Sequence, residues 1–327
     1  MNEKIESDCP HEQPQRPLLV IAGPTAVGKS EAAVEVARRI GGEIVSADSM
    51  QVYRHMDIGS AKITKEEMMG VPHHMIDVVD PDEEMDVARY ASMASEAIRS
   101  IYARGHMPIL CGGTGFYIQA VTRKIDFEET DADPAYRKEL SSIFDEKGAD
   151  YLHAKLKEID PKAAEEIHPN NKKRVIRALE YYKETGRCIS DHNEEEKKRS
   201  SPYDLAFFVI NMDRDLLYER INDRVDFMMQ EGLVDEVLYL RAMGLSRDNV
   251  SMQGLGYKEM LDYFDGRTTL DEAVEIIKRD SRHFAKRQIT WFKREEDAIW
   301  LDRLSFGDAR SVADYIVSIL KDRSFGK

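Results

Sequence analysis

Residues 18–30, Leu-Leu-Val-Ile-Ala-Gly-Pro-Thr-Ala-Val-Gly-Lys-Ser, join a short apolar run to a loop that ends in a lysine and a hydroxyl. Gly23 and Gly28 enclose four residues, and Lys29 and Ser30 follow, so the pattern G-x-x-x-x-G-K-[ST] is complete. In such a loop the backbone N–H groups point at phosphate oxygens, the lysine binds them and the hydroxyl holds Mg²⁺. The stretch predicts a phosphate site without identifying the molecule that carries the phosphate.

The flanks of this loop have the pattern that the motif requires. Residues 18–22 form a continuous apolar run, which predicts a buried strand. Residues 31–40 place their apolar side chains on one helical face, and Gly41-Gly42 predicts the end of that helix. A strand, loop and helix in this order favour an α/β fold with a P-loop NTPase-like parallel sheet flanked by helices.

Two further strand ends carry polar or flexible residues. Residues 43–48 predict a second strand that ends at Asp48, and residues 107–111 predict another strand that runs into Gly112-Gly-Thr-Gly115. In a parallel α/β sheet the carboxyl ends of the strands face the ligand. We therefore expect Asp48 and the glycine-rich turn to form two more walls of the crevice that holds the phosphate loop.

A chain of 327 residues is longer than a domain with a single hydrophobic core usually is, so we expect two domains or one domain with a large insertion. Charged helical stretches replace buried strands in residues 124–202, which predicts an all-helical insertion domain in an α/β core of residues 17–123 and 203–327. We expect residues 1–16 to be a disordered lead-in, because they are polar and acidic. Within the insertion, residues 192–201 are highly charged and predict a mobile segment.

Charge and cysteine usage exclude several classes of protein. The net charge of −14 disfavours a protein that coats nucleic acid indiscriminately. Cys9, Cys111 and Cys188 lie far apart without C-x-x-C spacing, which argues against a disulfide framework and a zinc knuckle and favours a cytoplasmic location. No apolar run reaches membrane-spanning length, so we expect no membrane association.

Two pairs of residues each allow both a structural and a functional role. His73 and His74 are adjacent, which favours hydrogen-bonding or structural roles over a shared metal. Arg220 and Arg224 lie one turn apart on a predicted helix over residues 215–229. Arginines so spaced usually pair with nearby carboxylates, and catalysis is the less common alternative.

A strongly basic segment interrupts this acidic chain. Residues 278–294 contain seven basic residues and one acidic residue, a local charge of +6, on a predicted helix that buries Val274, Ile277, Phe284, Ile289 and Phe292. Such an inversion of sign is the footprint of a polyanion. Residues 172–177 open a second basic helix, for which a merely solvated charge cluster is an equal alternative.

Taken in series, six motifs resemble the tRNA dimethylallyltransferase family. They are the phosphate loop, Ala-Asp-Ser-Met-Gln-Val-Tyr at 47–53, Met-Asp-Ile-Gly-Ser-Ala-Lys at 56–62, Pro-His-His at 72–74, Gly-Gly-Thr-Gly-Phe-Tyr at 112–117 and Lys-Arg-Gln-Ile-Thr-Trp-Phe at 286–292. The resemblance covers about residues 18–301, and the ordered set is far more specific than the phosphate loop alone. The bacterial type is the closer match, because no Cys₂His₂ spacing follows.

The resemblance implies transfer of a dimethylallyl group from its diphosphate to N6 of adenosine 37 in tRNA, with release of pyrophosphate. It implies Asp48 as the general base, Arg224 as the catalytic arginine and Thr114 as a residue near the reaction centre. It also implies Mg²⁺, held by Ser30 and the diphosphate, as the cofactor. The diphosphate would be bound by Gly23, Thr25, Ala26, Val27, Gly28, Lys29 and Ser30.

The same resemblance implies that the protein binds the anticodon stem-loop, because the adenine must leave its base stack to present N6 to the active site. We expect the chain to act as a monomer. The residues that would line the RNA are Asp48, Ser49, Met50, Gln51, Lys173, Arg174, Val175, Ile176, Arg177, Met252, Gln253, Gly254, Leu255, Gly256, Tyr257, Arg282, Lys286, Arg287, Gln288 and Lys293.

Two other functions fit parts of the sequence. A small-molecule or nucleoside kinase would use the same loop, with Arg220 and Arg224 clamping ATP, but it would not need the basic helix. A non-catalytic RNA-binding protein would need only the basic helix and would leave Asp48 idle. Transfer of label from dimethylallyl diphosphate or from γ-labelled ATP separates these possibilities.

Overall fold

The computed structural model describes residues 15–125, 133–198, 200–323 and 325–326. They belong to two compact units, one from residues 1–124 and 201–327 and the other from residues 125–200. Most of the predicted disordered lead-in lies outside the described residues. Its last residue was assigned wrongly, because Arg16 is the first residue of a strand that pairs with Tyr203.

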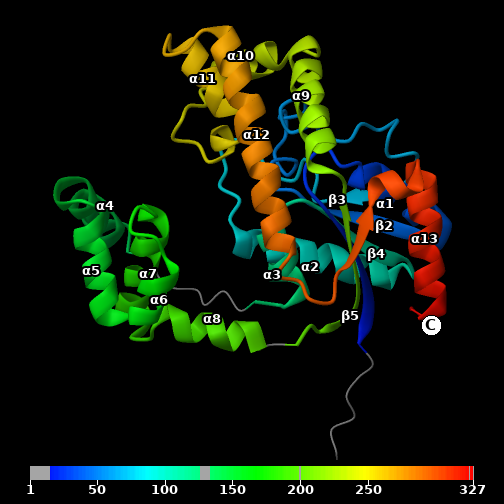
Figure 1. Cartoon of the computed structure of the whole chain (residues 1–327), viewed down its shortest axis with the longest axis horizontal. Helices are drawn as coiled ribbons and strands as arrows, with labels where there is room; N and C mark the ends of the chain where they lie inside the picture. Colours follow the sequence, from blue (N-terminus) through cyan, green and yellow to red (C-terminus); the bar gives the residue numbers. More distant parts are fainter. Residues whose placement is uncertain (1–14, 126–132, 199, 324, 327) are drawn as a thin grey trace, which may run out of the picture. The chain divides into compact units, whose positions relative to one another are not determined.

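The larger unit contains one six-stranded sheet, and every strand pairing in it is parallel (Figure 1). This confirms the predicted α/β class. The strand order is β3-β2-β4-β1-β5-β6. The strands are β1 (Arg16–Ala22), β2 (Gly42–Ala47), β3 (His73–His74), β4 (Met107–Gly112), β5 (Tyr203–Asn211) and β6 (Ile299–Asp302).

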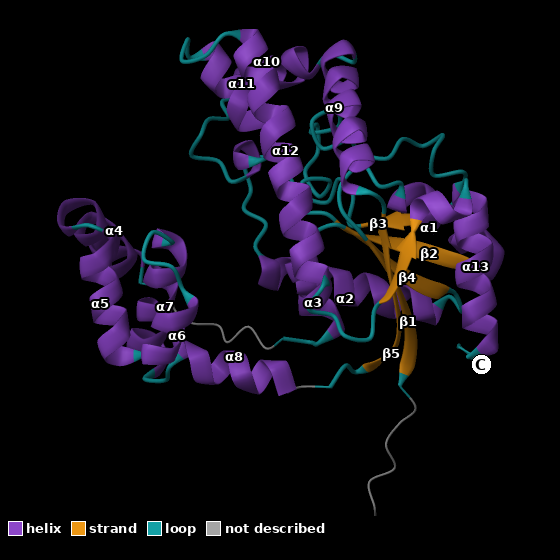
Figure 2. Cartoon of the chain, in the orientation of Figure 1, coloured by secondary structure: helices purple, strands orange, loops and turns teal. Residues whose placement is uncertain are grey.

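The central strands β1, β4 and β5 are buried on both faces of the sheet, which explains why they are apolar without alternation. Leu18 and Val20 belong to the core that includes α2 (Val87–Ala103) and α3 (Gly115–Thr122). Leu19 and Ile21 belong to the opposite core, with α1 (Lys29–Ile40) and α13 (Ala309–Asp322). Figure 2 shows helices on both sides of the strands. The unit is thus a three-layer α/β/α fold.

Further helices of this unit surround the carboxyl ends of the strands. They are α9 (Arg214–Gln230), α10 (Leu233–Ala242), the 3₁₀ turn η1 (Ser251–Gln253), α11 (Tyr257–Phe264), α12 (Leu270–Phe292) and the 3₁₀ turn η2 (Arg303–Phe306). Helix α12 begins with a capping box in which Thr269 and Glu272 bond each other's backbone N–H. It buries Ile277 and Phe292 as predicted, whereas Val274, Phe284 and Ile289 are only half-buried.

The smaller unit is entirely helical in its described residues. Its helices are α4 (Pro134–Lys147), α5 (Ala149–Ile159), α6 (Pro161–Glu166), α7 (Lys172–Thr185) and α8 (Ile189–Lys198). It has its own core, formed by Leu140, Leu152, Leu156, Val175 and Leu179 among others.

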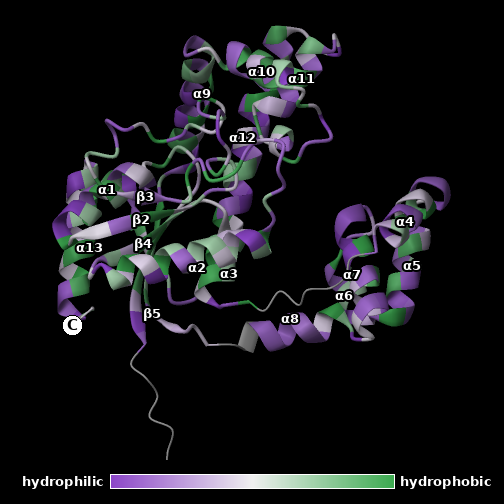
Figure 3. Cartoon of the chain, turned by 180° about the vertical axis from the view of Figure 1, so that it is seen from behind, coloured by the Kyte–Doolittle hydropathy of each residue, from purple (hydrophilic) through white to green (hydrophobic). Residues whose placement is uncertain are grey.

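Helix α8 covers residues 192–198 of the stretch that is predicted to be mobile, and residue 199 lies outside the described residues. The carboxylate of Asp160 anchors its first turn by accepting hydrogen bonds from Ser190 N, at 3.0 Å, and Ser190 Oγ, at 2.7 Å. Its composition is hydrophilic over most of its length (Figure 3), which hid the helix from periodicity arguments.

The carboxyl ends of three strands lie side by side, because Gly112 is in register with both Ala22 and Ala47. A Cβ atom at Gly112 would lie 2.1 Å from the carbonyl oxygen of Ala47, so only glycine permits this approach. The loops that follow these strands therefore start from one edge of the sheet, as predicted.

No helix among the residues that the structure describes combines the length and the apolar character needed to cross a bilayer.

Candidate active site

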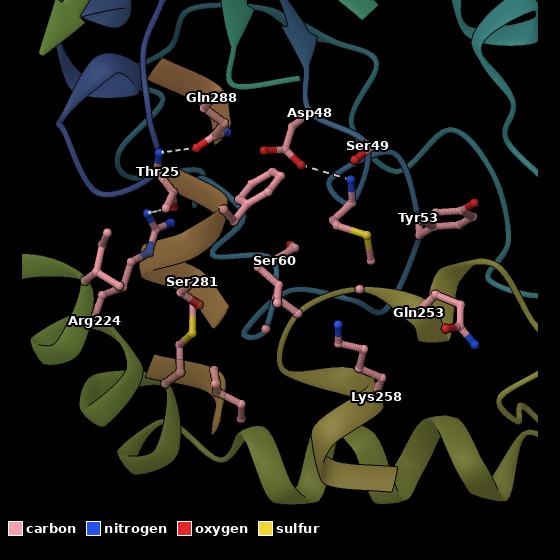
Figure 4. Close-up of a pocket in the computed structure, with 18 of the residues that line it drawn as sticks. Thr25, Asp48, Ser49, Tyr53, Ser60, Arg224, Gln253, Lys258, Ser281 and Gln288 are labelled. Atoms are coloured by element: carbon pink, nitrogen blue, oxygen red, sulfur yellow. Dashed lines mark hydrogen bonds between the residues drawn. The ribbon is translucent and has the colours of Figure 1, made fainter. Parts of the chain in front are cut away.

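A cavity of about 410 Å³ lies at this edge of the sheet (Figure 4). Its lining includes the polar or charged side chains of Thr25, Lys29, Asp48, Arg224 and Lys258. It also includes the apolar side chains of Met85, Tyr117, Ile221, Val225, Met228, Ile277 and Phe284. A site of this kind can hold a ligand with a charged end and an apolar end.

The phosphate loop has the backbone that its motif requires. Gly28 has φ of 91° and directly precedes α1, and Gly23 lies so close to β5 that a Cβ atom would be 2.4 Å from the carbonyl oxygen of Ile210. Lys29 Nζ reaches back over the loop to the carbonyl oxygen of Pro24, at 3.3 Å. The side chain of Val27 is buried in the core, so this residue can serve a phosphate only through its backbone N–H.

The charges at the site influence one another. Burial lowers the pKa of the Lys29 ammonium, and the nearby carboxylate of Asp48 opposes this shift. Burial likewise lowers the pKa of the Arg224 guanidinium, and Asp48 again favours the charged form. The thiol of Cys111 has its pKa raised by burial to about 11, which makes it a neutral group rather than a nucleophile.

Asp48 follows β2 directly and is held by the loop after it. Its Oδ1 accepts hydrogen bonds from the backbone N–H of Met50, at 2.9 Å, and of Gln51, at 3.4 Å. Thr114 belongs to the same group, since its Oγ1 accepts the N–H of Ser49 at 3.1 Å. The structure thus brings Asp48, Ser49 and Thr114 together, as the sequence predicts.

Both arginines of α9 contact the phosphate loop. Arg224 donates to Thr25 Oγ1 and to the carbonyl oxygen of Ala61, each at 3.3 Å, and Arg220 donates to the carbonyl oxygen of Ala26 at 3.0 Å. Neither forms an ion pair with a carboxylate among the described residues. The placement of Arg224 therefore favours a role at the site over a surface ion pair.

The side chain of Gln288 is buried and lines the cavity, so it does not belong to the exposed basic face of α12. Its Oε1 accepts the N–H of Thr25 at 2.9 Å (Figure 4). Its Nε2 donates to the carbonyl oxygen of Gly113, also at 2.9 Å. A Cβ atom at Gly113 would lie 2.3 Å from Gln288 Nε2, so this contact requires glycine. Gln288 therefore connects α12 to the phosphate loop and to the glycine-rich turn. The N–H group of Thr25 already has a hydrogen-bond acceptor in this structure.

The other predicted RNA residues of α12 differ in their surroundings. Lys286, Arg287 and Lys293 are exposed, and Arg287 also lines the cavity. Arg282 is only partly exposed and donates to Asn222 Oδ1 on α9 at 2.5 Å. Lys278, counted in the basic stretch, pairs with Asp226 at 2.7 Å. The charge that α12 offers to a ligand is therefore smaller than the local count of +6.

The helical unit divides its predicted residues in the same way. Lys173 and Arg174 are exposed on α7, and Arg177 Nη1 lies 3.7 Å from Glu184. Val175 and Ile176 are buried in the core of this unit. Their side chains support the helix and do not form an RNA-facing surface.

Residues 252–257 also form two groups. Gln253, Gly254 and Leu255 line the cavity, near Ser49 and Met50. Met252 and Tyr257 are fully buried, which corrects their predicted position at an RNA surface. Gly256 is the residue from which α11 starts, with φ of 90°. The buried side chains of Met252 and Tyr257 thus fix the two ends of a short loop whose middle residues line the cavity.

The donor set at the phosphate loop fits Mg²⁺. Ser30 offers a hydroxyl in the first turn of α1, and Asp48 offers a carboxylate in the same cavity wall as Lys29. No cluster of three metal-ligating side chains exists among the described residues. Mg²⁺ prefers few protein ligands together with phosphate oxygens and water, so a diphosphate would supply the rest. His73 and His74 instead bond Val71 O and Glu43 Oε2, as expected for structural roles.

Sequence relatives match this chain over nearly its whole length. The chain matches a family model described as IPP transferase over residues 51–295. It is 55% identical over 312 residues to the tRNA dimethylallyltransferase of Lachnoclostridium phytofermentans, a match that covers 95% of this chain and 100% of the relative. It is 52% identical over 289 residues to that of Acetivibrio thermocellus, covering 88% of this chain and 92% of the relative.

Solved structures resemble the fold over a similar share of the chain. The full-length tRNA isopentenylpyrophosphate transferase of Bacillus halodurans has a TM-score of 0.71 at 47% identity, covering 95% of this chain and 98% of that one. A eukaryotic dimethylallyltransferase, described as acting on tRNA, has a TM-score of 0.79 at 30% identity, covering 95% of this chain and 80% of that one.

Proposed function

The chain belongs to the IPP transferase family of tRNA dimethylallyltransferases, and on this premise we propose that it transfers the dimethylallyl group of dimethylallyl diphosphate to N6 of adenosine 37 in tRNA. The observation that carries the proposal is one cavity lined by Thr25 and Lys29 of the phosphate loop, by Asp48 and Arg224, and by the apolar side chains named above. The exposed cations of α12 argue against a kinase, which would not need them. The reaction forms the bond from N6 to C1 of the dimethylallyl group, breaks the bond from C1 to oxygen and releases diphosphate.

The phosphate loop would bind the diphosphate and stabilise the charge that develops as it leaves. Thr25 and Lys29 of this loop line the cavity together with Arg224, whose guanidinium donates to Thr25 Oγ1. Preorganised donors in a dry site stabilise such charge much better than water does. A bound Mg²⁺, held by Ser30 and diphosphate oxygens, would supply further charge neutralisation.

The apolar side chains that line the cavity would take the dimethylallyl group. Ile221, Val225 and Met228 come from the same helix as Arg224, and Phe284 and Ile277 come from α12. A five-carbon group that is placed against these side chains keeps its C1 atom near the guanidinium. Water is excluded on that side, which protects a reacting allylic carbon from hydrolysis.

Asp48 would accept the proton that N6 loses as it attacks. Adenine has to leave its stack to reach the cavity, and a buried site can then read its Watson–Crick edge. The carboxylate stands at the strand end that lines the cavity and is fixed by two backbone N–H groups. Thr114, through its contact with Ser49, supports the same loop.

Exposed cations on two elements would contact the RNA backbone. On α12 and at its C-terminal cap they are Lys286, Arg287 and Lys293, and on α7 they are Lys173 and Arg174. We propose residues 124–202 as an insertion domain with this role. We also propose a monomer that works in the cytoplasm, to which the two described cysteines, both free, are suited.

A donor test separates this function from its rivals. Unmodified tRNA and the purified chain are incubated with dimethylallyl diphosphate labelled in its carbon chain or with γ-labelled ATP. We expect label in the RNA from the first donor only. Label transferred from ATP would favour the kinase, and RNA binding without any transfer would favour a non-catalytic protein.

A further inference from the structure

The carboxylate of Glu236, in the first turn of α10, accepts four hydrogen bonds. Its Oε2 accepts the backbone N–H groups of Asp57, at 2.8 Å, and Ile58, at 2.7 Å. Its Oε1 accepts the N–H of Gly59, at 3.0 Å, and the hydroxyl of Tyr257, at 2.8 Å. Glu236 is half-buried and does not line the cavity.

Three successive backbone N–H groups that converge on one anion form a nest, an arrangement that holds anions tightly. An acidic residue in a first turn often does no more than complement the helix dipole. Asp235, its neighbour on the same turn, is exposed. Glu236 differs because it fixes a segment that lies 177 to 179 residues earlier in the chain.

That segment, residues 57–61, reaches the cavity. Gly59 and Ser60 line it, and Gly59 packs so closely on Tyr257 that a Cβ atom would lie 2.6 Å from the ring. The carbonyl oxygen of Ala61 accepts hydrogen bonds from Arg224 Nη2, at 3.3 Å, and from Gln51 Nε2, at 3.2 Å.

We infer that Glu236 is a positioning residue for the transfer reaction. It holds residues 57–59 so that the carbonyl group of Ala61 orients the guanidinium of Arg224 and the side chain of Gln51. Arg224 has two anchors, Thr25 Oγ1 and Ala61 O, and removal of the second frees the guanidinium to rotate away from the diphosphate. The inference rests on the proposed function, because it assigns Arg224 to the leaving group.

The test compares Glu236→Gln with Asp235→Asn. Glutamine keeps the size of the side chain but turns an NH₂ group toward backbone N–H donors, whereas Asp235→Asn makes the same charge change on the same turn. We expect Glu236→Gln to lower kcat by roughly 10- to 100-fold, with less than about a 3-fold change in the Kd for dimethylallyl diphosphate, since small misplacements at a site cost this much. We expect Asp235→Asn to behave like the wild type.

A double-mutant cycle separates positioning from general stability. In single-turnover assays with excess enzyme, Glu236→Gln should cost less than about 3-fold when Arg224→Ala is already present, because the two residues act through one contact. Equal decreases in both backgrounds would overturn the inference.

A second variant and the wild-type activity distinguish the possible outcomes. If Glu236→Gln does not fold, Tyr257→Phe removes one of the four hydrogen bonds and should still lower kcat by about 3-fold; unchanged kcat would overturn the inference. Inactive wild-type protein and Asp235→Asn would instead overturn the proposed function. Active wild-type protein with a fully active Glu236→Gln variant would overturn the positioning role alone.

Discussion

The two oxygens of the Asp48 carboxylate have different surroundings. Oδ1 accepts the N–H groups of Met50 and Gln51, whereas Oδ2 has no hydrogen-bond donor among the described residues. Because backbone hydrogen bonds fix the carboxylate through one oxygen, the other oxygen is available to accept a proton in the proposed reaction. The residue therefore combines a fixed position with a free acceptor, as a general base requires.

Substitution of Asp48 by asparagine keeps the shape and removes the basic oxygen. We expect kcat to fall by roughly 10²- to 10⁴-fold, the usual contribution of a positioned base, with little change in KM. Steady-state kinetics with an anticodon stem-loop measure both constants. Asp82→Asn, at an exposed position in the same unit, serves as the control. A change in KM alone would show that Asp48 binds and does not catalyse.

Arg220 and Arg224 form a matched pair, because both donate to the phosphate loop from one helix. Only Arg224 lines the cavity. We expect Arg224→Ala to lower kcat by about 10²-fold or more, the usual contribution of a charge-stabilising donor, and Arg220→Ala by less than about 10-fold. Equal and small decreases would place both arginines in the support of the loop.

At the scale of elements, α12 faces in two directions. Gln288 points inward to Thr25 and Gly113, while Lys286 and Lys293 point to solvent. The spacing of Ala285, Gln288 and Phe292, all buried, follows one helical face. This periodicity is the sequence signal from which a buried side chain at Gln288 could be predicted. The hydrogen-bond partners of Gln288 could not be predicted, because Thr25 and Gly113 lie 263 and 175 residues away in the chain.

The exposed cations of α12 predict the salt dependence of RNA binding. Removing one cation that binds a phosphate of single-stranded RNA lowers the slope of log affinity against log salt by about 0.7, so Lys286→Ala with Lys293→Ala should flatten it by about 1.4. Binding of dimethylallyl diphosphate should not change. Titration of an anticodon stem-loop at several salt concentrations measures the slope.

The matched control is Lys278→Ala with Arg279→Ala, which removes the same charge from the same helix. These cations already pair with Asp226 and Asp280, so we expect the slope to stay as in the wild type. If both double variants flatten the plot equally, the response reflects net charge and not binding to individual phosphates.

Local sequence patterns could predict the elements that carry the site. The phosphate loop, the strand end at Asp48 and the turn before Thr114 depend on neighbours in the chain, and the structure places all three at one edge of the sheet. The nest around Glu236 could not be predicted, because it depends on a loop far away in sequence. Phe284 was assigned to the core wrongly, since helical periodicity cannot distinguish a core from an apolar cavity wall.

At the scale of the whole molecule, one buried carboxylate links several elements of the sheet. Glu43, at the start of β2, accepts hydrogen bonds from Arg104, at 2.9 and 2.7 Å, and lies 2.6 Å from ring nitrogens of His74 and His106. Chiefly the Arg104 hydrogen bond lowers the pKa of Glu43 to about 2. Because this value lies below the ordinary range, the charged form stabilises the fold.

Stability should therefore depend on pH through Glu43. Its contribution is fully present above the ordinary glutamate pKa of about 4.3 and disappears as pH falls toward 2, through the folded-state pKa. We expect Glu43→Gln to lower Tm at pH 7 and the difference from the wild type to shrink between about pH 4.5 and 2. Calorimetry over this range, with the exposed Glu31→Gln as control, measures it. A constant difference at every pH would contradict the assignment.

The central claim concerns one atom of one nucleotide, and it can be tested by identifying the modified nucleoside. Unmodified tRNA with adenosine at position 37 and the same tRNA with guanosine there are incubated with the chain and dimethylallyl diphosphate, digested and analysed by mass spectrometry. The account predicts N6-dimethylallyladenosine from the first tRNA and none from the second, with one diphosphate released per modified nucleoside. Modification of both tRNAs, or of neither, would contradict it.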